Sequence, residues 1–184
     1  MVRPLACFVL LGACSGNSPA PDVSITPVSA RVTTSTGAGV VNLSRSVETV
    51  GVPVAVNASP DSVFAALVAT YKDLGIAPAL LDPARRLAGN ELFRARRRLG
   101  GAPMQNYVDC GGNLGQAHAE TYDMELGVVS YVSPAAGGNS TITTTLSAAG
   151  SDPMFGKDRQ MQCASTGELE RRIVTMVRER LKLK

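Results

Sequence analysis

The segment SPDSVFAALVATYKDLG, residues 59–75, is the clearest helix signal in the chain. Ser59 is a favourable N-cap residue, and Pro60 suits the first helical position, where its missing backbone N–H has no partner to lose. Gly75 stands where helices often end in a left-handed conformation. Apolar residues recur between these ends at helical spacing, which predicts one buried face. That face consists of Val63, Phe64, Leu67, Val68, Tyr71 and Leu74.

Extended segments flank this helix on both sides. ETVGVPVAV (48–56) precedes it, IAPALLD (76–82) follows it, and LAGNELFRARRRL (87–99) comes after a turn at 83–86. Their valine content and alternating polarity favour strands. A glycine-rich loop at 100–117 then leads to the second half of the domain.

The second half indicates a hairpin and a closing helix. We expect strands at 119–132 and 140–150 around a turn at 135–139, then RQMQCAS (159–165) leading into a helix at 165–184. The element order is therefore β-α-β-β-β-β-α. This order predicts an α+β fold in which a curved antiparallel sheet carries both helices on one face, in a helix-grip-like arrangement.

The start of the chain has the pattern of an export signal. Its apolar run at 5–13 is too short to span a bilayer but has the length of a signal-peptide core. LGAC at 11–14 resembles the lipobox of bacterial lipoproteins. The resemblance implies removal of residues 1–13 and lipid attachment at Cys14, which anchors the chain to a membrane facing the periplasm. Ser15 favours the outer membrane. A buried apolar N-terminal segment is the alternative.

Composition separates a tether from a folded domain. Residues 14–46 are rich in Ser, Thr, Gly and Pro, which predicts a flexible, lipid-anchored tether, or else a loosely packed arm. Residues 47–184 are long enough for one α+β domain with a real core. The net charge of +3 and the aromatic content of 4% argue against nucleic acid as a partner.

Two cysteines remain in the predicted domain, Cys110 and Cys163. Export to an oxidising compartment favours a disulfide between them. One alternative is a metal site that adds His118, although this spacing matches no standard zinc motif. The other alternative is a pair of buried thiols.

His118 is the only histidine, so any Ser-His-Asp or Cys-His mechanism has to use it. Asp109, Glu120 and Asp123 lie near it in sequence, but their spacing fits no known acid–base pattern. CGGNLG (110–115) lacks the Lys-Ser/Thr ending of a phosphate-binding loop. We therefore predict no catalysis, no cofactor and no metal.

The main charge feature is RARRR (94–98), where a strand places Arg94, Arg96 and Arg98 on one face. In one interpretation this face binds anionic lipid headgroups, phosphate or an acidic partner. In the other it pairs with acids on an adjacent strand. Those acids are Asp123 and Glu125. The candidate contact surface combines this face with the glycine loop around Asn106 and Asn113.

The stretch SPDSVFAALVATYKDLGIAPALLDPARRLAGN (59–90) resembles the repeated helix-grip domains of a lipoprotein component of the outer-membrane β-barrel assembly machine. The shared features are a D-x-V-F-x-x-L helix ending in LGI and a D-P-x-x-R-x-x-G turn into a basic strand. That family is lipid-anchored, is not enzymatic and acts by protein contact. The resemblance implies the same for this chain, which has one such domain and adds the glycine loop and two cysteines.

We therefore expect a cell-envelope lipoprotein whose domain is a non-catalytic binding or scaffold module in the periplasm, with an envelope protein as its partner. The first alternative is a binder of a small apolar ligand, held in a cavity between the sheet and the last helix. The residues expected to line that cavity are Tyr122, Met124, Ile142 and Met176. The second alternative is a hydrolase that uses His118.

Overall fold

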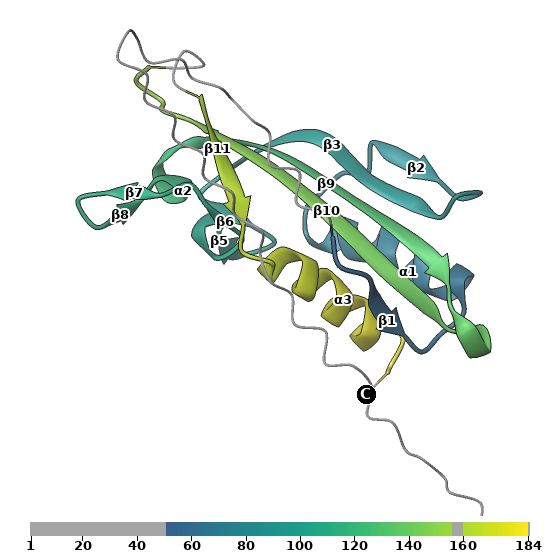
Figure 1. Ribbon diagram of the computed structural model, residues 1–184. Coiled ribbons are helices and arrows are strands. Elements are labelled where there is room, and N and C mark those ends of the chain that lie inside the picture. Colours follow the sequence, from purple (N-terminus) through teal and green to yellow (C-terminus); the bar gives the residue numbers. More distant parts are fainter. Residues whose placement is uncertain (1–50, 156–159, 184) are drawn as a thin grey trace, which may run out of the picture.

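The structure is a computed structural model that describes residues 51–155 and 160–183 (Figure 1). The predicted signal peptide, the lipid-bearing Cys14 and the tether 14–46 lie outside the described residues. In the two described ranges, no helix has both the length and the apolar character needed to cross a membrane.

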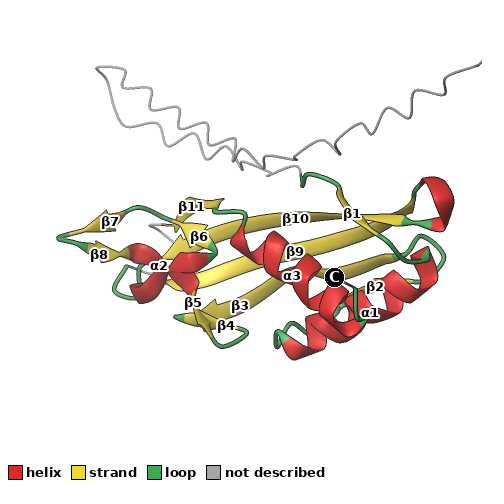
Figure 2. Cartoon of the chain, turned by 90° about the horizontal axis from the view of Figure 1, so that it is seen from below, coloured by secondary structure: helices red, strands yellow, loops and turns green. Residues whose placement is uncertain are grey.

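One long antiparallel sheet carries two helices on one face (Figure 2). The strand order is β2-β3-β9-β10-β11-β6, and β1 also pairs with β10. The longer elements are α1 (Pro60–Asp73), β3 (Leu87–Arg96), β9 (Asp123–Pro134), β10 (Ser140–Ser151), β11 (Gln160–Ser165) and α3 (Glu168–Arg180). The short ones are β1 (Val54–Val56), β2 (Leu80–Asp82), β4 (Arg98–Leu99), β5 (Ala102–Pro103), η1 (Met104–Asn106), β6 (Val108–Asp109), β7 (Gly112–Asn113), β8 (Gln116–Ala117), α2 (His118–Thr121) and η2 (Ala136–Gly138). The predicted α+β fold is confirmed.

Helix α1 forms as its sequence predicts. The Ser59 side chain accepts a hydrogen bond from the Ser62 backbone N–H at 3.4 Å, Pro60 opens the helix, and Gly75 follows its end with a φ of +74°. These features satisfy an otherwise unpaired donor at one end and stop the helix at the other. The buried face turns toward β3, β9, β10 and α3.

A chain of hydroxyl groups crosses the apolar core. The Tyr71 hydroxyl on α1 shares a hydrogen bond of 2.9 Å with Ser130 Oγ on β9, which shares one of 2.7 Å with Thr144 Oγ1 on β10. All three residues are buried. Because each hydroxyl has a partner, the chain costs little desolvation and fixes the distance of α1 from the sheet.

Burial raises the pKa of the Tyr71 phenol well above its ordinary value of 10.0. The contribution of Tyr71 to the free energy of unfolding is therefore fully present below pH 10. It falls as the pH rises above 10, because the unfolded chain loses this proton while the folded chain keeps it. We expect Tyr71→Phe to cost about 1 kcal/mol at neutral pH. Above pH 10 that deficit should shrink by up to about 1.4 kcal/mol per pH unit. Urea unfolding at pH 7, 9 and 11 measures it, and a constant difference between the two proteins would contradict it.

Several predicted boundaries are wrong. The strand expected at 48–56 is extended only at 54–56 within the described residues, and the one expected at 76–82 begins at Leu80. The segment expected to open the strand 119–132 starts as the helical turn α2, which the Tyr122 N–H closes by donating to the His118 carbonyl at 2.8 Å, and which lies next to η1 and β6. The predicted loop 100–117 contains four short strands and a 3-10 turn.

A bulge in β3 reverses the side-chain alternation of that strand. Asn90 pairs with Val128 and Phe93 with Leu126, so β3 has one extra residue opposite β9. Ala88 is buried, and simple alternation from it would turn Arg94 toward the core. The extra residue instead turns Phe93 inward and Arg94 outward.

Candidate functional site

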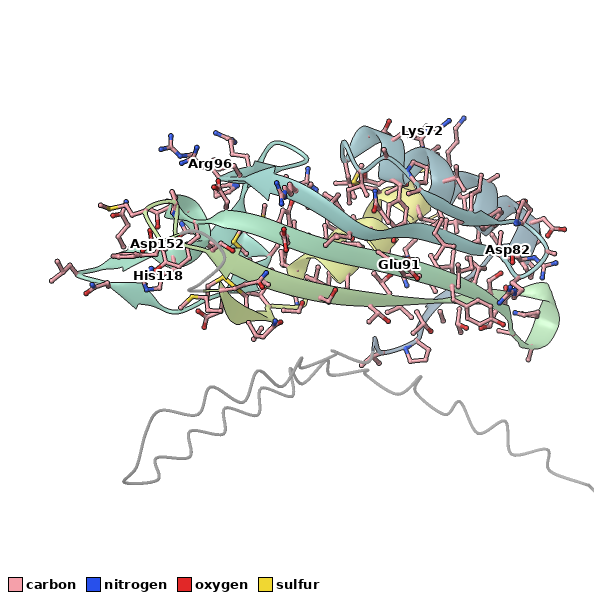
Figure 3. The ribbon with its side chains drawn as sticks, turned by 90° about the horizontal axis from the view of Figure 1, so that it is seen from above. Lys72, Asp82, Glu91, Arg96, His118 and Asp152 are labelled. Carbon is pink, nitrogen blue, oxygen red and sulfur yellow. A yellow bond between two sulfur atoms is a disulfide. The ribbon has the colours of Figure 1, made fainter. Side chains whose placement is uncertain are left out.

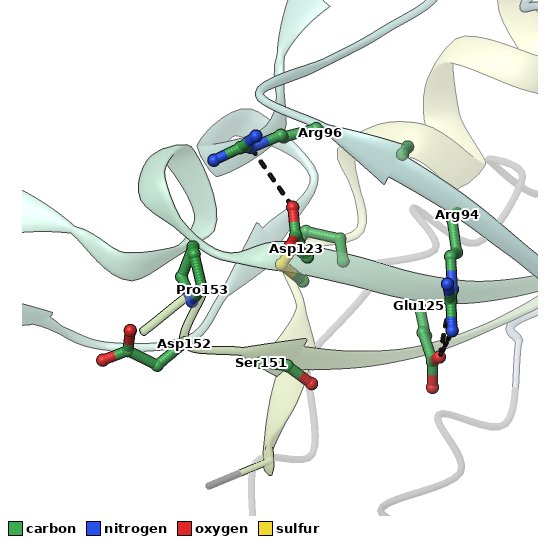
Figure 4. Close-up of a pocket in the computed structure, with 9 residues that line it drawn as sticks. Arg94, Arg96, Asp123, Glu125, Ser151, Asp152 and Pro153 are labelled. Atoms are coloured by element: carbon green, nitrogen blue, oxygen red, sulfur yellow. Dashed lines mark hydrogen bonds and ion pairs between the residues drawn. The ribbon is translucent and has the colours of Figure 1, made fainter. Parts of the chain in front are cut away.

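The ends of β3, β9 and β10 meet at one end of the sheet, where Figure 3 places Arg96, His118 and Asp152, opposite Asp82. A pocket of about 500 Å³ lies there (Figure 4). Its lining comes from residues 94–96, 123–125 and 151–153. The first two segments contain predicted site residues, while the third was not predicted.

Two cross-strand ion pairs line this pocket. Arg94 Nη2 lies 3.1 Å from Glu125 Oε1, and Arg96 Nε lies 3.2 Å from Asp123 Oδ1. The strand register brings each pair together, because Arg94 is directly opposite Glu125 and Arg96 is opposite Asp123. Gln160 Nε2 donates a further hydrogen bond of 3.1 Å to Glu125 Oε2. The interpretation in which these arginines pair with acids on an adjacent strand is thus confirmed for Arg94 and Arg96.

Arg98 does not share their strand face, so the predicted row of three arginines is wrong. Arg97 has a φ of +62° and separates β3 from β4. This left-handed residue redirects the chain. The Arg98 guanidinium then donates to the Gly101 carbonyl, at 3.1 Å from Nε.

The glycine loop is fixed to the rest of the domain at its start and near its middle. The Arg172 guanidinium on α3 donates to the Gly100 carbonyl at 2.6 Å and to the Tyr107 hydroxyl. The Asn106 carbonyl accepts a hydrogen bond of 2.5 Å from Thr166 Oγ1, whereas Asn113 is exposed on β7. Of the two predicted asparagines, one therefore holds the loop in place and the other projects from it.

A disulfide joins Cys110 to Cys163, as predicted. It lies beside the β6–β11 ladder, in which Asp109 pairs with Ala164. Both sulfurs are thereby used, so the alternative of a metal site with Cys110, Cys163 and His118 is wrong for this structure. Across the described ranges, no other group of three or more His, Cys, Asp or Glu side chains is placed to hold a metal.

His118 begins α2 and stacks on Tyr122, with 4.6 Å between ring centroids. Among the described residues, its imidazole makes no hydrogen bond to a carboxylate or hydroxyl group. This arrangement gives His118 no partner that a hydrolase mechanism would use. The hydrolase alternative therefore stays a prediction.

The four residues expected to line an apolar ligand cavity are not all brought together: Tyr122 and Met124 both lie against Gly150, but Ile142 does not. Met124 is opposite Gly150, and Ile142 is opposite Val132. Because Gly150 and Ile142 lie eight positions apart on β10, about 27 Å separates the two pairs. Met124 instead forms a buried part of the polar pocket.

We expect the two ion pairs to differ in strength. Arg94 is 72% exposed but its partner Glu125 has a side chain only 18% exposed, whereas Arg96 and Asp123 are both more than half exposed. Solvent screens the exposed pair more strongly, so Arg94→Ala should cost about 1 kcal/mol and Arg96→Ala less than about 0.5 kcal/mol. Urea unfolding at low and high salt tests this ranking, and equal costs at both salt concentrations would refute it.

Neither a protein-family model nor a curated protein sequence matches this chain. The resemblances to bacterial lipoproteins and to the assembly-machine lipoprotein therefore stay predictions from the sequence.

Proposed function

We propose that this chain is a cell-envelope lipoprotein whose domain binds or scaffolds another envelope protein without catalysis. In this proposal, lipid on Cys14 attaches it to a membrane facing the periplasm, with the outer membrane favoured. The disulfide between Cys110 and Cys163 supports an oxidising compartment, since such bonds persist outside the cytosol.

The pocket end of the sheet carries this proposal. Side chains of both charge signs surround a pocket of about 500 Å³, and Met154 next to it is 87% exposed. An apolar ligand would take water from these ion pairs without offering any hydrogen bond in its place. A protein surface can meet them with its own polar groups and cover the exposed apolar ones, as interface rims and centres do.

Site-specific photo-crosslinking in membranes tests the proposal. A photoreactive phenylalanine analogue replaces Ser151 at the pocket, and in a control it replaces Ala84 in the exposed turn before β3. Asp152 is adjacent to position 151, and Asp82 is two positions from position 84. Figure 3 places these two aspartates at opposite ends of the sheet. We expect one defined protein adduct from position 151 and none from position 84. Adducts from neither position, or equally from both, would contradict a contact at the pocket end.

The lipid anchor is tested separately. Cys14→Ala should release the chain from membranes into the soluble fraction, because no acylated cysteine remains to hold it. Fractionation of cells producing the two proteins measures this. A Cys14→Ala chain that stays with membranes to the same extent would remove the anchor from the proposal.

A further inference from the structure

The hairpin formed by β7 and β8 has an unusual residue at its turn. Gly112 pairs with Ala117 and Asn113 with Gln116, which leaves Leu114 and Gly115 as a two-residue turn. Their φ angles are +50° and +80°, as in a type I′ turn. Such turns favour Asn, Asp or Gly at the first position, and a leucine there is strained.

Burial gives no compensation for that strain, because Leu114 is 99% exposed. The hairpin projects from the body of the domain beyond α2 (Figures 1 and 2). A fully exposed leucine gains nothing from the hydrophobic effect in the free protein. Neither the turn geometry nor burial in the core therefore accounts for a leucine at this position.

The base of the hairpin is held firmly. Cys110 is tied to β11 by the disulfide, and the Asp109 carboxylate accepts the Gly111 N–H at 2.7 Å. The Gly111 carbonyl in turn accepts the His118 N–H at 3.0 Å. The leucine is thus presented from a fixed support, which lowers the ordering cost of binding.

The hairpin lies at the same end as the pocket. It leads directly into α2, which begins at His118, and Figure 3 shows both His118 and Asp152 at this end of the sheet. Met154 follows Asp152 by two positions and is also largely exposed. Leu114 and Met154, two almost fully exposed apolar side chains, therefore lie at the end of the sheet where the proposed function places the protein contact.

We propose that Leu114 is an anchor side chain that the hairpin inserts into an apolar pocket of a protein partner. This inference rests on the proposed function and adds how the partner is held. The partner's pocket accepts one leucine-sized side chain, and its rim is basic. Basic groups there complement Asp109 and Glu120, the acids that flank the hairpin on either side.

A lipid bilayer fits this hairpin poorly. No Lys or Arg occurs between Arg98 and Lys157 in the sequence, so the hairpin itself has no cation beside Leu114 for anionic headgroups, and the exposed Arg96 at this end is already paired with Asp123. The tip also has a single large apolar residue, whereas interfacial attachment needs a broader apolar face. One side chain is enough to fill a preformed protein pocket.

The test compares Leu114→Asn with the matched control Leu114→Met in the full-length, membrane-bound chain. Complexes are fixed by chemical crosslinking, recovered through a tag and quantified. We expect Leu114→Asn to reduce the complex roughly 10- to 100-fold, because the apolar contact is lost. Leu114→Met should keep most of it, since it preserves apolar volume.

Thermal unfolding of the same variants separates binding from folding. Asn adopts a positive φ more readily than Leu, so Leu114→Asn should unfold at the same or a higher temperature than the wild type. A lower unfolding temperature together with loss of the complex would mean that Leu114 supports the fold, which overturns the anchor role.

Two further arms identify the occupant. The chain contains no Trp, so Leu114→Trp creates a single reporter. The purified full chain is placed in vesicles of phosphatidylethanolamine and phosphatidylglycerol, and exposed-indole emission equal to that in detergent is expected. A blue shift in these protein-free vesicles would assign the tip to the bilayer and overturn the proposal. A dimer of the purified chain that Leu114→Asn dissociates would instead identify a second copy, and would also overturn it.

The outcomes also distinguish this inference from the proposed function. If the wild-type chain forms no complex, then the proposed function fails, and the inference fails with it. If the wild type forms a complex that Leu114→Asn leaves unchanged, only the anchor role of Leu114 is overturned.

Discussion

Removal of the Cys110–Cys163 disulfide should lower the free energy of unfolding by about 4 kcal/mol. The two cysteines are 53 positions apart, so the bond closes a long loop and restricts the unfolded chain strongly. Both sites are buried, which makes Cys110→Ala with Cys163→Ala a better replacement than serine. Urea unfolding of the double variant measures the loss.

The disulfide also has a local effect that the same variant can reveal. Strands β6 and β11 pair through only two residues each, at Val108 and Asp109 and at Ala164 and Ser165. Without the bond we expect faster amide exchange in 108–118, while α1 keeps its protection. Reduction of the wild type is the control, and the reduced wild type should unfold at the same urea midpoint as the double variant. A midpoint unchanged by reduction or substitution would contradict the stabilising role.

The elements that could be predicted are those whose sequence contains its own boundary signals. Helix α1 has Ser59, Pro60 and Gly75 around one apolar face, and each acts locally as expected. In the hairpin of β9 and β10, buried and more exposed residues alternate along most of each 12-residue strand, except at 126–128 and 148–150, where all three residues are buried. Burial of one face then determines which side chains point inward.

The bulge in β3 could not be predicted because the residue that leaves room for it lies in another strand. A Cβ on Gly127 of β9 would stand 2.5 Å from the Glu91 carbonyl oxygen, so the bulged backbone fits only over a glycine. No property of residues 87–99 alone indicates that a glycine of another strand lies opposite Glu91. The outward direction of Arg94 and its pairing with Glu125 both depend on it.

In the candidate site, too, some features could be predicted from the residues themselves, while others depend on how distant segments meet. The disulfide followed from two cysteines in an expected oxidising compartment, and the ion pairs followed from opposite charges on neighbouring strands. The contribution of residues 151–153 depends on where β10 ends beside β3 and β9. The exposure of Leu114 depends on a hairpin that CGGNLG alone did not indicate.

Gly89→Ala should destabilise the domain by about 3 kcal/mol, through close contact with the backbone of β9. Gly89 pairs directly with Val129, and its added Cβ would stand 2.2 Å from the Val128 carbonyl oxygen and 2.7 Å from the Val129 Cα. Strand β9 pairs with β3 on one side and β10 on the other, so it has little freedom to move away. Strand β3 must shift instead, next to the bulge that aligns Arg94 with Glu125.

Gly101→Ala is the matched control, because it isolates conformational strain from steric overlap. Gly101 has a φ of +82° and no atom within 4 Å of an added Cβ, so its substitution should cost only about 1 kcal/mol. Gly89 lacks a positive φ, which leaves overlap as the cause of its larger loss. Urea unfolding of both variants compares the two effects. A Gly89→Ala loss no greater than that of Gly101→Ala would mean that β3 moves freely against β9, and the register that pairs Arg94 with Glu125 would then need another explanation.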